Sequence, residues 1–289
     1  QEDGARLGET LTQRWRAGVI VKAASGPCFG IEAAVPVPVD WPEQTVTLVE
    51  KDITSSARVS YRMVQGGVRQ MVISIPSLRA GQEAKAVVTM EVERSSQEPP
   101  EDTSIYQLPV ERKLPKEIRY MYLDASPLIE VRNAKIRKLA KEIGVDEETA
   151  WGRVEAIYDW VRANVEYKNG PIKGALAALR DGTGDCEELT SLFIAICRAG
   201  GIPARTVWVP GHCYPEFYLV DAEGNGHWFP CQAAGSRAFG GIPEHRPILQ
   251  KGDNFRSPNN PRDRQRYMSE GLTGKGGKPS VTWVKELVD

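Results

Sequence analysis

The sequence predicts an α+β protein, in which an all-β N-terminal part is followed by a part that mixes helices and strands. Residues 10–110 read as short extended segments rich in β-branched residues, with almost no helical periodicity. From about residue 113 onward, apolar residues recur at helical spacing instead. At 289 residues, the chain has room for one large domain or two ordinary ones.

The N-terminal segments suit an antiparallel β-sandwich of immunoglobulin-like size, since about seven short strands fit into that length. Pro36 and Pro38 predict that their strand lies at a sheet edge, because proline lacks the N–H that an inner strand donates. The polar, proline-rich stretch 95–101 is the best boundary signal in the chain. We therefore expect a β-sandwich domain over residues 1–112 and a second domain, with a loop-rich C-terminal tail, over 113–289.

In the second domain, the first predicted helix covers residues 126–144 and ends at a glycine. Asp146 is the expected cap of the next helix, whose apolar stripe covers residues 154–161. A short helix is predicted at 175–179. Near the C-terminus, residues 280–284 alternate like a strand that returns to the sheet or to the first domain.

The most informative stretch places a cysteine at a helix start. A glycine-bearing turn ends in Asp185, a good N-cap, so Cys186 falls in the first turn of an apolar helix. The free amides and dipole of that terminus stabilise a thiolate, and the backbone N–H of Cys186 is free to bind an oxyanion. Glu187 and Glu188 would raise the thiol pKa if they pointed inward. The alternative is that Cys186 is a small buried apolar residue.

A nucleophilic cysteine needs a base, and the chain has three histidines. His212 starts the first strand of a predicted β-hairpin, and Gln232 lies near the end of the second. His212 and Gln232 lie on the same face of the hairpin only if the numbers of paired residues add up to an even number. The length of the turn between the strands does not decide this register. We expect His227 and His245 to be exposed and structural.

These residues closely resemble the transglutaminase-like superfamily of papain-like thiol enzymes, over roughly residues 115–239. The resemblance is carried by Gly184-Asp185-Cys186, by the helix end 198–205, by His212-Cys213-Tyr214-Pro215-Glu216, by Trp228-Phe229-Pro230-Cys231-Gln232 and by 157–167 upstream. The resemblance implies a papain-like transglutaminase core, with the nucleophile helix packed on an antiparallel β-sheet. It also implies acyl transfer or hydrolysis at an amide through a thioester.

By the same resemblance, Cys186 is the nucleophile and His212 the base, while Gln232 stands where the family usually has Asp. An Asp both orients the imidazole and stabilises its charged form, whereas a Gln carbonyl only orients it. Papain-like proteases use a neutral Asn in this role, so a triad of Cys, His and amide is chemically workable.

Four further residues are candidates for the substrate cleft: Tyr167, Asn169, Tyr214 and Trp228. Cys213 and Cys231 are expected behind the sheet from His212 and Gln232, where they either pack or form a cross-strand disulfide. A zinc site of His212 and the nearby thiolates is disfavoured by the spacing, so we expect no metal.

Composition excludes other classes of function. Lys and Arg total 37 against 38 Asp and Glu, which gives no global basis for nucleic-acid binding. The longest strongly apolar run, 192–197, is far shorter than the roughly 18 residues that span a bilayer. No nucleotide-binding or calcium-binding motif is present, so no cofactor is implied.

Because the chain begins at Gln1, we expect export to the periplasm or outside the cell, with a signal segment removed.

The predicted function is that of a cysteine enzyme acting on amide or peptide bonds of a protein or peptide substrate. Hydrolysis is favoured over cross-linking, because a cross-linking enzyme must exclude water while admitting an amine. The alternative is a catalytically degenerate domain that binds a peptide or cell-wall ligand. The oligomeric state is left open.

Overall fold

The computed structural model describes residues 4–257, 260 and 262–288, so Gln1 lies outside the described part. Its contacts divide the chain into two compact units. The α+β unit comprises residues 1–9, 96–244 and 251–267, and the β unit comprises 10–95, 245–250 and 268–289. The fold class is mixed α+β with a strand-rich N-terminal region, as predicted.

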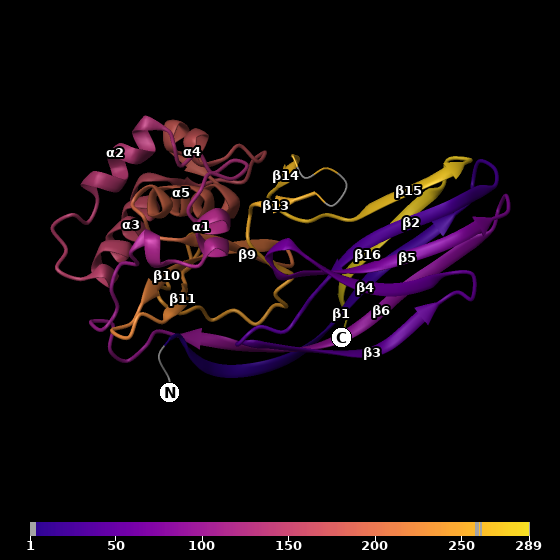
Figure 1. The fold of residues 1–289 in the computed structure, drawn as a ribbon, viewed down its shortest axis with the longest axis horizontal. Helices are drawn as coiled ribbons and strands as arrows, with labels where there is room; N and C mark the ends of the chain where they lie inside the picture. The colour runs from indigo at the N-terminus through magenta and orange to yellow at the C-terminus, as the bar shows by residue number, and fades with distance from the viewer. Residues whose placement is uncertain (1–3, 258–259, 261, 289) are drawn as a thin grey trace. The chain divides into compact units, whose positions relative to one another are not determined.

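The elements of the described residues form a run of strands, then a helical stretch, and then a second run of strands (Figure 1). The helices are α1 (Lys116–Tyr122), α2 (Ala134–Glu142), α3 (Ala150–Asn164), α4 (Ala175–Asp181) and α5 (Cys186–Ala199), with single 3₁₀ turns at Gln65–Gly67 and Glu111–Lys113. The strands are β1 (Arg6–Lys22), β2 (Cys28–Val37), β3 (Gln44–Ile53), β4 (Arg58–Val64), β5 (Val68–Leu78), β6 (Glu83–Glu98), β7 (Glu166–Tyr167), β8 (Thr183–Gly184), β9 (Ala204–Val209), β10 (His212–Val220), β11 (Gly226–Pro230), β12 (Gln250–Lys251), β13 (Phe255–Arg256), β14 (Arg264–Gln265), β15 (Gly271–Gly276) and β16 (Ser280–Val288).

The β unit consists of two four-stranded antiparallel sheets, in the orders β16-β1-β6-β3 and β15-β2-β5-β4. Val19 and Val88 of the first sheet and Ile31 and Ile73 of the second belong to one buried cluster. Each strand therefore turns one face of its period-2 pattern toward a shared core, and the two sheets pack face to face (Figure 1).

The C-terminal strands change the predicted domain division. β16 pairs with β1 and β15 pairs with β2, so residues 268–289 belong with the N-terminal sheets and not with residues 113–267. β2 is an inner strand for the same reason, in contrast to the predicted edge. Pro36 is nevertheless tolerated, because β15 covers β2 only from Cys28 to Ala34.

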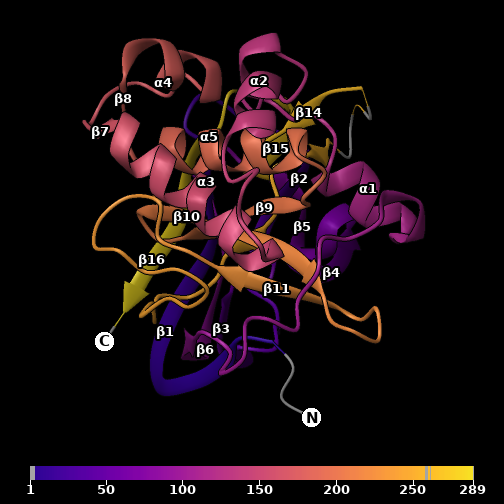
Figure 2. The same ribbon diagram turned by 90° about the vertical axis from the view of Figure 1, so that its left-hand side faces the viewer.

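The α+β unit is built on the sheet β11-β10-β9-β12, whose strands β9, β10 and β11 are antiparallel. Helix α5 lies over one face of this sheet, with α3 beside it (Figure 2). Phe193 and Ile196 of α5 share a buried cluster with Phe217 of β10 and Phe229 of β11. A helix packed on an antiparallel sheet is the arrangement that the resemblance implies.

Two helix starts differ from the predicted ones. Asn133, whose side chain accepts from the Lys135 N–H at 2.9 Å, caps α2, so this helix begins later than residue 126. Thr149, not Asp146, caps α3 by accepting from the Gly152 N–H at 2.9 Å. Helix α1 was not predicted. The apolar periodicity located the helices, but several polar residues near each start were equally good caps by type.

Candidate active site

Helix α5 begins at Cys186 with a complete capping box. The carboxylate of Asp185 accepts from the Glu187 N–H at 2.8 Å, and Glu188 accepts from the Asp185 N–H at 3.2 Å. These bonds pair backbone N–H groups that have no partner within the helix, and they fix the direction of the first helical turn. Cys186 therefore occupies the predicted first turn.

The glycines before Cys186 have local structural roles. Gly182 ends α4 in the left-handed conformation, with φ of 66°. A Cβ on Gly184 would lie 2.4 Å from the Cβ of Glu188, so only glycine lets β8 pass this close to α5. Gly184 is therefore needed for the packing of β8 against α5.

The hairpin register joins His212 to Gln232. Phe217 pairs with Phe229, an even sum, so His212 and Gln232 share a face of the sheet. The Nε2 atom of His212 lies 3.0 Å from Oε1 of Gln232. A carbonyl oxygen only accepts, so Nε2 carries the hydrogen and Nδ1 is left to accept a proton.

The backbone of Gln232 is itself held by helix α3. Tyr158 donates its hydroxyl hydrogen to the Gln232 carbonyl at 2.8 Å, and Nη1 of Arg162 donates to the same oxygen at 3.0 Å. The Tyr158 hydroxyl in turn accepts from the Ala238 N–H at 3.0 Å. Sequence reasoning missed this support, because it joins residues 70 and 74 positions apart.

Cys186 is an acidic thiol in this setting, with its pKa lowered to about 4. The largest cause is the hydrogen bond that the Cys213 thiol donates to the Cys186 sulfur. Hydrogen bonds from His212 and from the Cys213 N–H, and the charge of His212, lower the pKa further, whereas burial raises it. The sulfur is therefore a thiolate at neutral pH. The role of Cys213 was also missed, since alternation placed its side chain away from His212.

Cys213 reaches Cys186 although its side chain alternates with that of His212 along β10. His212 is the first residue of β10, after a turn in which Gly211 has φ of 69°. The start of α5 approaches this strand end, where neighbouring side chains can both reach one sulfur. The Cys213 sulfur also lies 3.9 Å from Oγ1 of Thr190 on α5, which puts it on the helix side of the sheet.

The acidic side chains next to Cys186 form hydrogen bonds and ion pairs with other groups. Glu187 lies 3.4 Å from Nη2 of Arg266, and burial raises its pKa. Glu188 accepts from the backbone N–H of Lys173 at 2.8 Å, as well as from Asp185. Burial, followed by the hydrogen bond with Glu188, raises the pKa of Asp185 to about 6. Arg266 thus offsets the charge of Glu187, and backbone N–H groups hold the Glu188 carboxylate.

Two cleft candidates lie beside the start of α5. Tyr167 pairs with Gly184 across the β7–β8 ladder, and its hydroxyl donates to Asn169 at 3.0 Å. Both side chains are exposed, so they are free to meet a substrate that approaches Cys186. Their contact with substrate stays a prediction.

The other two candidates are positioned differently. Tyr214 is fully buried, with 0% exposure, so it cannot line an open cleft. The ring of Trp228 lies 4.0 Å from the Arg205 guanidinium, which donates to buried Glu216 at 2.7 Å. Trp228 therefore packs on an internal ion pair. Alternation along a strand does not distinguish such a packed face from a cleft.

All five cysteines are free, so the disulfide alternative for Cys213 and Cys231 is not what the structure contains. Among the described residues, no group of three or more His, Cys, Asp or Glu side chains is arranged to hold a metal ion. None of the helices in residues 4–257, 260 and 262–288 is long and apolar enough to cross a membrane.

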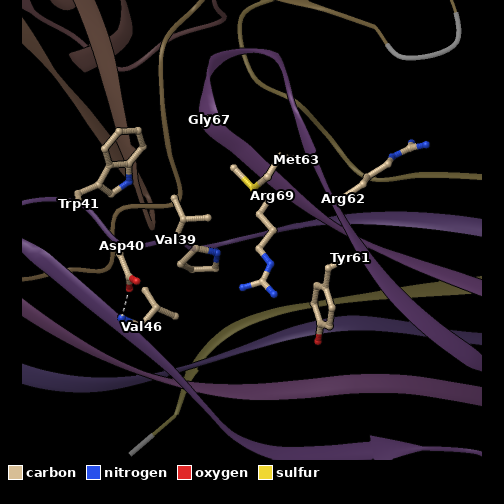
Figure 3. Close-up of a pocket in the computed structure, with 10 residues that line it drawn as sticks. Val39, Asp40, Trp41, Val46, Tyr61, Arg62, Met63, Gly67 and Arg69 are labelled. Atoms are coloured by element: carbon tan, nitrogen blue, oxygen red, sulfur yellow. Dashed lines mark hydrogen bonds between the residues drawn. The ribbon is translucent and has the colours of Figure 1, made fainter.

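A separate hollow of about 580 Å³ lies in the β unit (Figure 3). Trp41, Tyr61, Met63 and Arg69 line it, with the Arg69 guanidinium 4.4 Å from the Tyr61 ring. The Asp40 carboxylate accepts a hydrogen bond from the Val46 N–H at 2.7 Å. This lining contains no nucleophile and base pair comparable to Cys186 and His212.

Comparison with known proteins shows a likeness of fold to one solved structure. No curated protein matches the sequence. A protein from Cytophaga hutchinsonii described as a "putative cysteine protease" shares 19% identity, with a TM-score of 0.64 over 98% of this chain and 92% of that one, which is a likeness of fold. The periplasmic domain of TgpA from Pseudomonas aeruginosa, bound to ethylmercury, is 14% identical over 80% of this chain and 90% of that one, with a TM-score of 0.37.

The family assignment comes from the sequence itself. Residues 137–233 match the Transglutaminase-like superfamily, and this segment contains Cys186, His212 and Gln232. It also contains α5 and the β10–β11 hairpin, which bring those three residues together. The segment 137–233 is therefore a transglutaminase-like domain.

Proposed function

We propose that the protein is a cysteine hydrolase that cleaves amide or peptide bonds in a protein or peptide substrate. The observation that carries the proposal is the low-pKa thiolate of Cys186 in hydrogen-bond contact with His212, whose other ring nitrogen lies 3.0 Å from Gln232. Export from the cytoplasm is part of the proposal, and cell fractionation tests it.

The reaction follows from these positions. The Cys186 sulfur attacks the amide carbonyl carbon, and the developing oxyanion is stabilised by the backbone N–H of Cys186 and by the dipole of α5. His212 gives its Nδ1 proton to the leaving amine as the C–N bond breaks, which leaves a thioester. Water then loses a proton to His212 and attacks the thioester, releasing the acid and restoring the thiolate and imidazolium pair.

The first test is the pH dependence of iodoacetamide alkylation at each cysteine, read by peptide mass spectrometry. Cys186 should react fast below pH 7, because its pKa of about 4 leaves it ionised there. His212→Ala should slow Cys186 at least about tenfold near pH 6, since a proton acceptor is lost. His227→Ala is the matched control, because His227 pairs with Asp221 at 2.9 Å.

A positive result should be followed by peptide libraries, with Cys186→Ala as the inactive control and new termini as the readout. If Cys186 instead reacts like an ordinary thiol with a pKa near 8.5, the hydrolase proposal fails. The substitution of the family's Asp by Gln232 then favours the degenerate peptide-binding module.

A further inference from the structure

A second sulfur lies against Cys186. Cys213 follows His212 on β10, and its sulfur is 3.9 Å from Oγ1 of Thr190, one helical turn after Cys186 on α5. The thiol and the backbone N–H of Cys213 both hydrogen-bond to the Cys186 sulfur. The two sulfurs therefore meet between α5 and β10, and both are reduced.

We propose that Cys186 and Cys213 are a modification site, where a hydroperoxide oxidises Cys186 and Cys213 then closes a disulfide onto it. The proposal uses the reactive thiolate of the proposed function but does not require that any amide is hydrolysed. Its consequence is a reversible loss of the nucleophile under oxidising conditions.

The environments of the two sulfurs suit different roles. Cys186 is partly exposed and ionised, and thiolates are the form that peroxides attack. Cys213 is 1% exposed. Its pKa is raised well above the usual value by the hydrogen bond to Cys186 and by burial, so it stays protonated and is shielded from peroxide. Cys186 is thus the peroxide target and Cys213 the resolving thiol.

The chemistry balances with hydrogen peroxide as the oxidant. The Cys186 sulfur attacks one peroxide oxygen, the O–O bond breaks, and the departing hydroxide takes the proton that Cys186 gave to His212 and becomes water, which leaves a sulfenic acid. The Cys213 sulfur then attacks the sulfenic sulfur, the S–O bond breaks, and the hydroxide released takes the Cys213 proton as a second water. Two thiols and one peroxide become one disulfide and two waters.

The other three cysteines are poor competitors for this step. Cys197 and Cys231 are fully buried and their pKa values are raised by burial. Cys28 belongs to the β unit, where its thiol donates to the Gly277 carbonyl at 3.1 Å. Cys213 is the cysteine whose thiol hydrogen-bonds to Cys186 in the described structure.

The test treats the full chain with hydrogen peroxide and maps its peptides without reduction. The native protein should give a Cys186–Cys213 linked peptide, lose iodoacetamide alkylation at Cys186 and regain it with dithiothreitol. Cys213→Ser keeps a hydroxyl donor but cannot form the bond, so its Cys186 should proceed to sulfinic acid that dithiothreitol does not restore. Cys28→Ser, the matched control, should behave as the native protein.

The outcomes separate this inference from the hydrolase proposal. Fast alkylation of Cys186 in the native protein before peroxide shows that the fold and the thiolate are intact, and the alkylation rate of untreated Cys213→Ser is the baseline for that variant. If peroxide then gives equal sulfinic acid in both and no linked peptide, the modification site is refuted while the hydrolase proposal stands. If Cys186 reacts with neither reagent in the native protein, both proposals fail.

Discussion

At the scale of single residues, Gln232 is the side chain that sets this site apart from the family pattern. Its amide oxygen holds Nε2 of His212 at 3.0 Å, and its own carbonyl is held by Tyr158 and Arg162. It can orient the imidazole ring without adding a negative charge. The low pKa of Cys186 depends on hydrogen bonds from Cys213 and His212, so a neutral third residue is compatible with a thiolate.

The residue-scale prediction concerns this orientation. Gln232→Glu retains the length of the side chain and adds a charge that stabilises the imidazolium, so alkylation of Cys186 below pH 7 should be equal or faster. Gln232→Ala should slow it at least about tenfold, because the ring loses its anchor. Equal rates in native protein and Gln232→Ala would show that Gln232 does not position His212.

At the scale of secondary-structure elements, the start of α5 is a tightly packed junction with β8. The capping box positions the first turn, and Gly184 lets the strand and the helix approach. These are local features, so the nucleophile's place at the helix terminus follows from a few consecutive residues.

Gly184→Ala tests this junction. The new Cβ would lie 2.4 Å from the Cβ of Glu188, which cannot rotate away. We expect about 1–3 kcal/mol of destabilisation from overpacking, together with slower Cys186 alkylation. Gly170→Ala is the matched control, since a Cβ there meets open space, and it should change neither quantity. Urea unfolding and alkylation rates at neutral pH measure both, and an unchanged Gly184→Ala would contradict the packing role.

At the scale of the whole molecule, chain order does not follow the two units. The β unit collects residues 10–95, 245–250 and 268–289, because β15 and β16 each add an edge strand to one of its sheets. Leu272, Val281 and Trp283 of these strands pack on the β-unit core. The C-terminal segment is therefore a structural part of the sandwich and not a loose tail.

Truncation after Glu270 should accordingly destabilise the β unit by more than about 3 kcal/mol, since three apolar side chains and two strand pairings are lost. Hydrogen exchange should rise along β1 and β2. Lys285→Gln removes only the partly exposed ion pair with Glu270 at 3.1 Å and should cost at most about 1 kcal/mol. Protection of β1 and β2 that survives truncation would refute this assignment.

Short-range patterns in the sequence were enough to predict the site's main elements. Capping acts within one helical turn, so Asp185 and the place of Cys186 at the start of α5 could be read directly. The apolar periodicity predicted α3, α5 and the hairpin, although cap choice misplaced the starts of α2 and α3 by several residues. The family motifs identified His212 and Gln232, whose shared face then depended on the hairpin register.

By itself, the sequence determined an α+β protein with a cysteine at a helix start, because periodicity, capping and turns act over a few neighbouring residues. Its motifs also identified the transglutaminase-like domain. Only the tertiary structure decided that Cys213 meets Cys186, that Tyr214 is buried and Trp228 packed on Arg205, and that β15 and β16 complete the N-terminal sheets. Those contacts join residues tens to hundreds of positions apart, and strand alternation alone carries no information about what the opposite element presents.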